Sequence, residues 1–508
     1  MSSSESSSTH CCQQLVPPLD EVSNSGRNVI FLFDGTGDNK EEDSFRVEEE
    51  PTYSDRQMVF YRPGIGTWRP EKKRDWLPFY RTISKKVDEA VASNFEEHVI
   101  HAYDTLANHY RDGDEICLFV SIGFSRGAYT ARAVAAVVAF FGLLSRDTPN
   151  YSKLLDEIKE TYFEPTRNHY LSQAYQLVKN SFGGKPEDKD EHFSAKFREK
   201  AEEFCLKHKT RKVVLEFVGV WDTVSSVGAV TAPDAMFTSS NPHLRYFRHA
   251  IALDEKRVRF DRAMWCKKYT KEFEDTDIEQ VLTATHTDFR DFSLDVGGGS
   301  VGDQSKDDLA NISLRWMIRE CFKAKTGIIF DSDALEAVGL KPTGLYPEVK
   351  PRPAALPPNQ KSAVQNPAPK SQGWFSGWFS TKKPTESPVK QKDPRTEEER
   401  DLGDALAPFY RPSTTGSMFW GLMEVIPMKK WNSIKRESTR TANWWAGRKI
   451  DIRIANKKLG SIKVHRTVKT RMIAQPEDPE AEPYVPAATL EDFGAKIKVD
   501  SPHIEWVD

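Results

Sequence analysis

The 508-residue sequence lacks the long apolar segment that a membrane-spanning helix needs. Its longest apolar run, Ala133 to Leu144, is well short of the roughly 20 residues required to cross a bilayer. The first residues, MSSSESSSTHCCQQ, also lack the basic and apolar regions of a secretory signal peptide. These absences predict a cytoplasmic protein.

An excess of charge of either sign is also missing. The 72 Lys and Arg residues nearly balance the 75 Asp and Glu residues, so nothing indicates a nucleic-acid partner. Cysteine is scarce, and the six cysteines show no metal-ligand spacing, which is compatible with a reducing compartment. We therefore expect neither a metal nor a cofactor. The hydrophobic fraction of 38% is low for a fully packed chain and predicts disordered segments.

What is present is organised around a single glycine-serine-glycine motif. Residues 116–122 form a short apolar run typical of a buried strand, and Gly123-Phe124-Ser125-Arg126-Gly127 follows directly. The alanine-rich segment after it predicts a buried helix. Strand, Gly-x-Ser-x-Gly and helix together are the context of a nucleophilic serine on a sharp turn. We predict that Ser125 is a nucleophile; the alternative is a serine that caps the following helix.

A second loop follows the predicted strand Asn28 to Phe33. Its backbone N–H groups at Gly35 and Thr36, with that of Arg126, are expected to face an oxyanion. The aspartates of the same loop, Asp34 and Asp38, are candidates for holding a cation. An ordinary Asx-type turn is the alternative for them.

Two further polar residues follow predicted strands. Asp222 comes after the apolar run Arg211 to Val220, and His286 after the run that begins at Val281. The chain order Ser125, Asp222, His286 matches the order of serine, acid and histidine in α/β hydrolases. His286 would accept the serine proton and Asp222 would orient the imidazole. A capping or loop carboxylate is the alternative for Asp222, and His249 and His465 are the alternative histidines.

Alternating strand and helix patterns predict an α/β fold with a mostly parallel sheet flanked by helices. We expect a disordered tail over residues 1–27 and a core over residues 28–345, with a helical insertion at about 150–210. A disordered linker or surface insertion, rich in Pro, Lys, Gln and Glu, is expected over residues 346–401. Residues 402–508 should pack on the core, with paired strands between residues 449 and 469.

Four aromatic residues interrupt the predicted linker: Trp374, Phe375, Trp378 and Phe379. They stand beside two lysines, a combination that suits the interface of a membrane or of an apolar partner. The alternative is that they pack back onto the core.

Several ordered motifs give the sequence a resemblance to a known family. The chain resembles the α/β-hydrolase family of type VI secretion phospholipase effectors and their uncharacterised fungal and bacterial relatives. The resemblance implies an α/β-hydrolase fold, a serine triad and, in the effector branch, cleavage of phospholipid esters. Matched residue by residue, the nucleophile falls on Ser125 and the acid on Asp222. The motifs are FDGTGDN, YRPGIGT, GFSRGAYTAR, VGVWDTV, RHAIALDEKR, DVGGGS and LRWMI, with WGLMEVIP and VHRTVKTRM in the C-terminal part.

The chain departs from the family pattern at the histidine. The family has a histidine shortly before Asp-Val-Gly-Gly-Gly, whereas Ser293 occupies that place here and His286 stands seven residues earlier. We interpret the intervening residues as an insertion that leaves His286 functional. The expected activity is therefore hydrolysis of carboxylic esters, those of lipids or phospholipids above all. The alternative is a catalytically impaired pseudo-hydrolase that binds a lipid or a protein.

Overall fold

An eight-stranded parallel sheet forms the centre of the fold, in the order β15-β12-β7-β6-β5-β4-β2-β3. Every pair of neighbouring strands in it is parallel, which confirms the predicted sheet. The strands are β2 (Asn28–Phe33), β3 (Gln57–Arg62), β4 (Glu115–Val120), β5 (Leu215–Trp221), β6 (Leu244–Ala252), β7 (Asp277–Thr283), β12 (Ile462–His465) and β15 (Ile504–Val507). The computed structural model describes residues 15–18, 26–33, 55–62, 80–120, 126–164, 190–223, 241, 243–254, 265, 276–283, 307–358, 393–407, 428–432, 437–441, 448–450, 462–475, 482–490 and 495–508.

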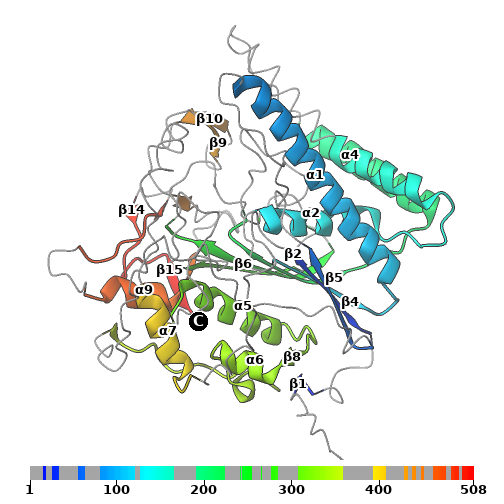
Figure 1. The fold of residues 1–508 in the computed structure, drawn as a ribbon. Helices are drawn as coiled ribbons and strands as arrows, with labels where there is room; N and C mark the ends of the chain where they lie inside the picture. The colour runs from blue at the N-terminus through cyan, green and yellow to red at the C-terminus, as the bar shows by residue number, and fades with distance from the viewer. Residues whose placement is uncertain are drawn as a thin grey trace, which may run out of the picture.

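Helices cover both faces of this sheet (Figure 1). On one face lie α1 (Tyr80–His109), α2 (Arg126–Phe141) and α4 (Asp190–His208), and α2 contacts β2, β4 and β5. On the other face lie α5 (Leu309–Lys323), α6 (Ser332–Ala337) and α7 (Glu397–Leu406). Because both faces are covered, a central strand such as β5 is buried at every residue. Such strands are continuous apolar runs, as the sequence indicated.

A helix approaches the sheet closely at Gly219 in β5. A Cβ added there would lie 2.8 Å from both Met317 Sδ in α5 and Phe119 Cδ1 in β4. These distances are too short for a side chain, so glycine lets Met317 of α5 pack directly on β5, the strand that precedes Asp222.

The predicted helical insertion contains a helix at residues 151–164 and α4. Aromatic rings join them to the core: Phe163 packs edge-on against Phe95 of α1, and Tyr162 against Phe197 of α4. This layer contacts α2 through α4.

The C-terminal part of the chain completes the central sheet with β12 and β15. Residues 449–469 were predicted as a region of paired strands, and the described part of this range contains two strands, each paired with strands outside it. β11 (Lys449–Ile450) pairs with β13 (Thr489–Leu490), whereas β12 pairs with β7 and β15. The helix α9 (Arg466–Ile473) begins directly after β12. Two short antiparallel pairings complete this part, β9 (Met428–Asn432) with β10 (Glu437–Thr441) and β13 with β14 (Ala495–Lys496).

Two elements occur inside segments predicted to be disordered. Within residues 1–27, β1 (Leu15–Val16) pairs with β8 (Phe330–Asp331), and Val16 belongs to the same buried apolar cluster as Ile318 and Leu335. Within residues 346–401, α7 begins at Glu397. Both elements pack on the α5 side of the molecule.

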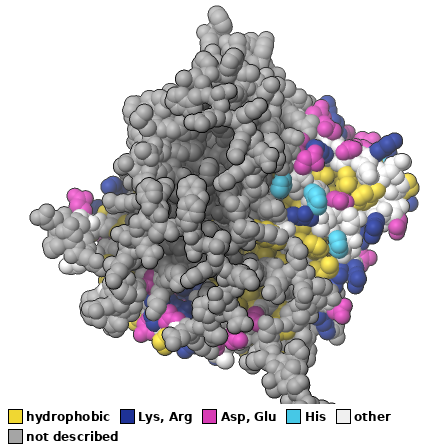
Figure 2. Space-filling view, viewed as in Figure 1, with side chains coloured by type: hydrophobic (Ala, Val, Ile, Leu, Met, Phe, Trp, Pro, Cys, Tyr) yellow, Lys and Arg dark blue, Asp and Glu magenta, His cyan; other side chains and the backbone are white. Residues whose placement is uncertain are grey.

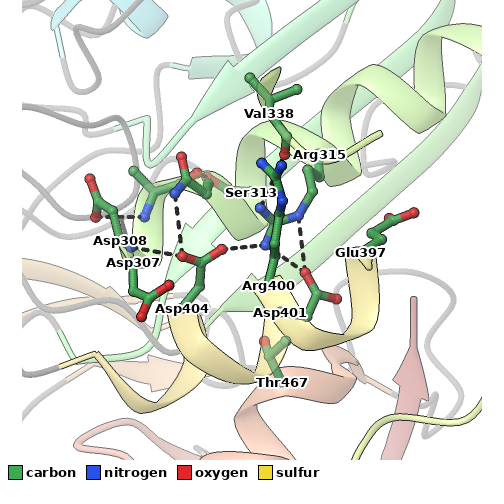
Figure 3. Close-up of polar contacts among 12 residues, drawn as sticks. Asp307, Asp308, Ser313, Arg315, Val338, Glu397, Arg400, Asp401, Asp404 and Thr467 are labelled. Atoms are coloured by element: carbon green, nitrogen blue, oxygen red, sulfur yellow. Dashed lines mark hydrogen bonds and ion pairs between the residues drawn. The ribbon is translucent and has the colours of Figure 1, made fainter. Parts of the chain in front are cut away.

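Buried ion pairs hold α7 on α5 (Figure 3). Arg315 of α5 donates from Nε and Nη2 to Asp401 Oδ1, at 3.0 and 2.6 Å, and Nη2 also contacts Asp404. The three side chains are 2–7% exposed. Arg352 adds a second guanidinium at 2.7 Å from Asp401 Oδ2. Charges this deeply buried are tolerated only when they are paired.

None of the described helices is long and apolar enough to cross a bilayer. The longest apolar run of the sequence begins in α2, where Ala133 and Val137 are fully buried behind the sheet. In the space-filling view, acidic and basic side chains are interspersed along the right side of the molecule (Figure 2).

Candidate functional site

The predicted site residues follow strands whose carboxyl ends meet at one edge of the sheet. In open α/β sheets this edge is where ligands bind. β4 precedes Ser125, β5 precedes Asp222 and β7 precedes His286. Asp222 is among the described residues, and Ser125 and His286 lie outside them.

The elements on either side of Ser125 are those that the sequence predicted. β4 ends at Val120 and α2 begins at Arg126, immediately after the serine. Val120 pairs with Phe33, the last residue of β2, so the segment that contains Gly35 and Thr36 starts beside the one that contains Ser125. Gly35 and Thr36 themselves lie outside the described residues. The N–H groups of the first helical turn have no acceptor within the helix, which suits them to an anion.

Asp222 is completely buried at the end of β5 and has an unusual backbone. Its φ of 38° lies in the left-handed region, which few residues other than glycine adopt and which aspartate tolerates better than most. The Asp222 N–H donates to the Ala250 carbonyl at 2.7 Å and extends the pairing with β6. The Asp222 carboxylate accepts a hydrogen bond from the Ala252 N–H at 3.0 Å. The backbone N–H and the side-chain carboxylate of Asp222 are therefore both hydrogen-bonded to β6.

Arg448 is the main partner of that carboxylate. Its Nη2 lies 2.9 Å from Asp222 Oδ2, and its Nη1 contacts Oδ1, so the pair is bidentate. The two side chains are 3% and 0% exposed. Sequence reasoning missed Arg448, because it is 226 residues from Asp222 and belongs to no motif.

His249 is fully buried in β6, and its Nε2 accepts a hydrogen bond from the Thr223 N–H at 3.1 Å. A nitrogen that accepts from a backbone amide is unprotonated and already engaged, so it is poorly placed to receive a proton from a substrate or serine. This geometry fits a packed structural histidine better than a catalytic base.

His465, the other alternative, is the last residue of β12 and the N-cap of α9. Its Nδ1 accepts from the Thr467 N–H. Burial lowers the pKa of His465 to about 3; Asp401 opposes the shift, whereas Arg352, Arg466 and Arg315 add to it. The side chain therefore remains neutral in the folded protein at pH values where an exposed histidine is charged.

This neutral histidine predicts a specific acid sensitivity. The unfolded chain binds a proton at His465 below about pH 6.5, whereas the folded protein binds it only near pH 3. The free energy of unfolding should therefore fall as the pH is lowered through this window, by up to ~5 kcal/mol from this residue. His465→Asn keeps a capping side chain. It should flatten the slope of the unfolding free energy against pH, measured by urea titrations at several pH values between 7 and 4.

His101→Asn, a change at an exposed histidine of α1, serves as the control and should leave that slope as it is. Equal slopes for the wild type and the His465 variant would contradict the assignment of the acid sensitivity to His465.

The remaining predicted residues concern a membrane contact and a cation site. Trp374, Phe375, Trp378 and Phe379 lie outside the described residues, as do Asp34 and Asp38. Within the described ranges, no group of three or more His, Cys, Asp or Glu side chains is arranged to hold a metal ion.

Comparison with known proteins gives three similarities. A family model for the T6SS phospholipase effector Tle1-like catalytic domain matches residues 27–320. An uncharacterised protein of Saccharomyces cerevisiae, YEL023C, is 30% identical over 252 residues, which are 47% of this chain and 32% of that protein. The chain thus spans about a third of the length of this relative. A crystal structure of an uncharacterised protein from Pseudomonas aeruginosa covers 59% of this chain and 46% of its own, with 15% identity and a TM-score of 0.29.

The family match covers more than half of the chain and contains every predicted site residue, from Gly35 to His286. It also contains β2 to β7 and most of α5, the part of the fold that positions the carboxyl edge of the sheet. The chain therefore belongs to the family of T6SS Tle1-like phospholipase effector catalytic domains.

Proposed function

We propose that this protein is a phospholipase-type hydrolase of carboxylic esters of lipids, with Ser125 as nucleophile, His286 as base and Asp222 as acid. Membership of the Tle1-like family supports lipid esters as the substrate class. The placement of β4, β5 and β7 supports the choice of these three residues, because each of them follows one of these strands.

The strand order is compatible with a meeting of the three residues. β4, β5, β6 and β7 are consecutive in the sheet, and a spacing of ~4.8 Å puts the ends of β4 and β7 about 14 Å apart. Residues 121–125 and 284–286 follow these ends, and an extended chain reaches up to ~3.4 Å per residue. The two segments are long enough for Ser125 and His286 to approach each other over the end of β5, where Asp222 lies.

The proposed reaction proceeds through an acyl-enzyme. Ser125 Oγ attacks the ester carbonyl carbon while His286 takes the hydroxyl proton. The negative charge on the carbonyl oxygen faces the N–H groups of Arg126 and of Gly35 or Thr36, each such donor being worth about 3 kcal/mol. His286 then gives the proton to the departing alcohol oxygen. A water molecule, deprotonated by His286, releases the fatty acid and regenerates the serine.

A fluorophosphonate probe tests the nucleophile directly. The purified wild-type protein should be labelled covalently, and peptide mapping should place the adduct on Ser125. Ser125→Ala should not react, whereas Ser121→Ala, in the same segment between β4 and α2, should react like the wild type. A folded wild-type protein that stays unlabelled, or a label that persists in Ser125→Ala, would contradict the proposal.

The second proposal is a pseudo-hydrolase that binds a lipid or a protein partner at the same edge of the sheet. The serine at position 293, in the place of the family histidine, favours it. An unlabelled protein that still binds phospholipid vesicles would support this second function. Either function would be assisted by membrane contact through Trp374, Phe375, Trp378 and Phe379.

A further inference from the structure

The carboxylate of Asp222 is held from the C-terminal part of the chain. Arg448 contributes both terminal nitrogens to it, and Nη1 also donates to the Ala252 carbonyl at 2.9 Å. Arg448 itself is fixed by its backbone, because its carbonyl accepts from the Thr489 N–H at 2.9 Å and β11 starts at the next residue. The main chain of Arg448 is thus fixed, and the side chain extends from this fixed point to the Asp222 carboxylate.

The same C-terminal segment covers the neighbouring strand end. The Ala488 N–H donates to the Leu253 carbonyl at 3.0 Å, directly after β6. Asp254, the next residue, accepts from the Tyr484 hydroxyl at 2.6 Å and from the Ala487 N–H at 2.9 Å. Residues 484–490 and Arg448 therefore form one unit docked on the carboxyl edge of the sheet, beside the end of β7.

The hydrogen bonds of Asp222 leave one position for a further donor. Oδ1 accepts from the Ala252 N–H and from Arg448 Nη1. Within the described part of the chain, Oδ2 accepts from Arg448 Nη2, and a carboxylate oxygen has two lone pairs. The bidentate guanidinium fixes the rotation of the carboxylate and keeps a buried charge paired. The remaining lone pair of Oδ2 consequently has a defined direction.

We propose that Arg448 is a positioning residue for the catalytic acid. It holds Asp222 so that Oδ2 accepts the N–H of the His286 imidazole. The proposal rests on the proposed function, since it assigns a role within that triad. Arg448 lies beyond residues 27–320, the part that matches the catalytic-domain family. The C-terminal part would therefore contribute to catalysis and not merely to folding.

Steady-state kinetics of Arg448→Lys and Arg448→Met test this role. Lysine keeps the charge but cannot form the fork-shaped contact. We expect kcat for a short-chain ester to fall about 10- to 100-fold, the size of effect that a small misplacement of a catalytic group produces, with KM within about twofold. Arg27→Lys is the matched control, because Arg27 and Asp114 form a similarly buried bidentate pair ahead of β2 and β4. It should lower thermal stability but leave kcat of the folded protein unchanged.

A double-mutant cycle separates positioning from general stabilisation. Arg448→Met should have less than a threefold effect on kcat in an Asp222→Asn background, where no carboxylate is left to position. The doubly substituted chain also lacks the unpaired buried charge that endangers folding of each single variant. An unchanged kcat in Arg448→Lys, or equal effects of Arg448→Met in both backgrounds, would overturn the proposal while Ser125 labelling still supported the hydrolase. Loss of wild-type labelling would instead overturn the hydrolase itself.

Discussion

Replacing His286 with glutamine is expected to lower kcat for ester hydrolysis by roughly 10³- to 10⁴-fold, with little change in KM. Glutamine has a similar size and can form hydrogen bonds, but it cannot take up a proton near neutral pH. The loss corresponds to removal of a general base that acts in the transition state, which is why it should appear in kcat. Initial rates with a short-chain ester, together with the rate of fluorophosphonate labelling, measure it.

His243→Gln provides the control for this substitution. His243 stands before Leu244 at the amino end of β6, at the opposite edge of the sheet from the proposed site. Its replacement should leave kcat within about twofold of the wild type. Wild-type activity in His286→Gln would show that the base lies elsewhere. A gain of activity on adding Ser293→His to that variant would place the motif histidine at position 293.

Replacing Arg315 with methionine is expected to lower the free energy of unfolding by about 3–5 kcal/mol. The substitution leaves Asp401 and Asp404 buried without the guanidinium that pairs with both (Figure 3). Breaking a buried ion pair on one side costs this much, because the Asp404 carboxylate stays out of water without its guanidinium partner, whereas Asp401 keeps Arg352. Urea denaturation with linear extrapolation measures the change.

Lys200→Met is the matched control, since Lys200 pairs with Glu164 at 3.4 Å with both side chains about half exposed. It should change the unfolding free energy by less than about 0.5 kcal/mol. Adding Asp404→Asn to Arg315→Met should restore part of the loss, because the carboxylate that has lost its guanidinium partner is then replaced by a neutral amide, whereas Asp401 still pairs with Arg352. Equal stability of the Arg315 and Lys200 variants would show that the network contributes nothing measurable.

The parallel sheet was predictable from the sequence because buried strands of such a sheet are continuous apolar runs. Asn28–Phe33 and Leu215–Trp221 are of this kind, and both are strands in the structure. The alanine-rich segment after Ser125 was likewise expected to be a helix, and it is α2 (Arg126–Phe141). The positions of Ser125, Asp222 and His286 after strands follow from these assignments. Their triad geometry stays a prediction.

Contacts between distant segments could not be predicted from local patterns. Nothing around Arg448 distinguishes it from the other arginines, and its carboxylate partner is 226 residues away. Period-two patterning indicates a strand but not its partner, so the pairing of β12 with β7 was missed. One signal was present and overlooked: Thr396 and Glu399 have capping-box spacing and start α7, inside a segment interpreted from composition alone.

The place of β12 in the sheet has a consequence for biosynthesis. Lys463 of β12 and Glu279 of β7 form an ion pair across 184 residues of sequence. A ribosome needs roughly 10 to 40 s to add that length of chain, and throughout that time the nascent β7 has no partner on its outer side. Exposed strand edges recruit other chains, so a chaperone that shields this edge should improve the yield of correctly folded protein.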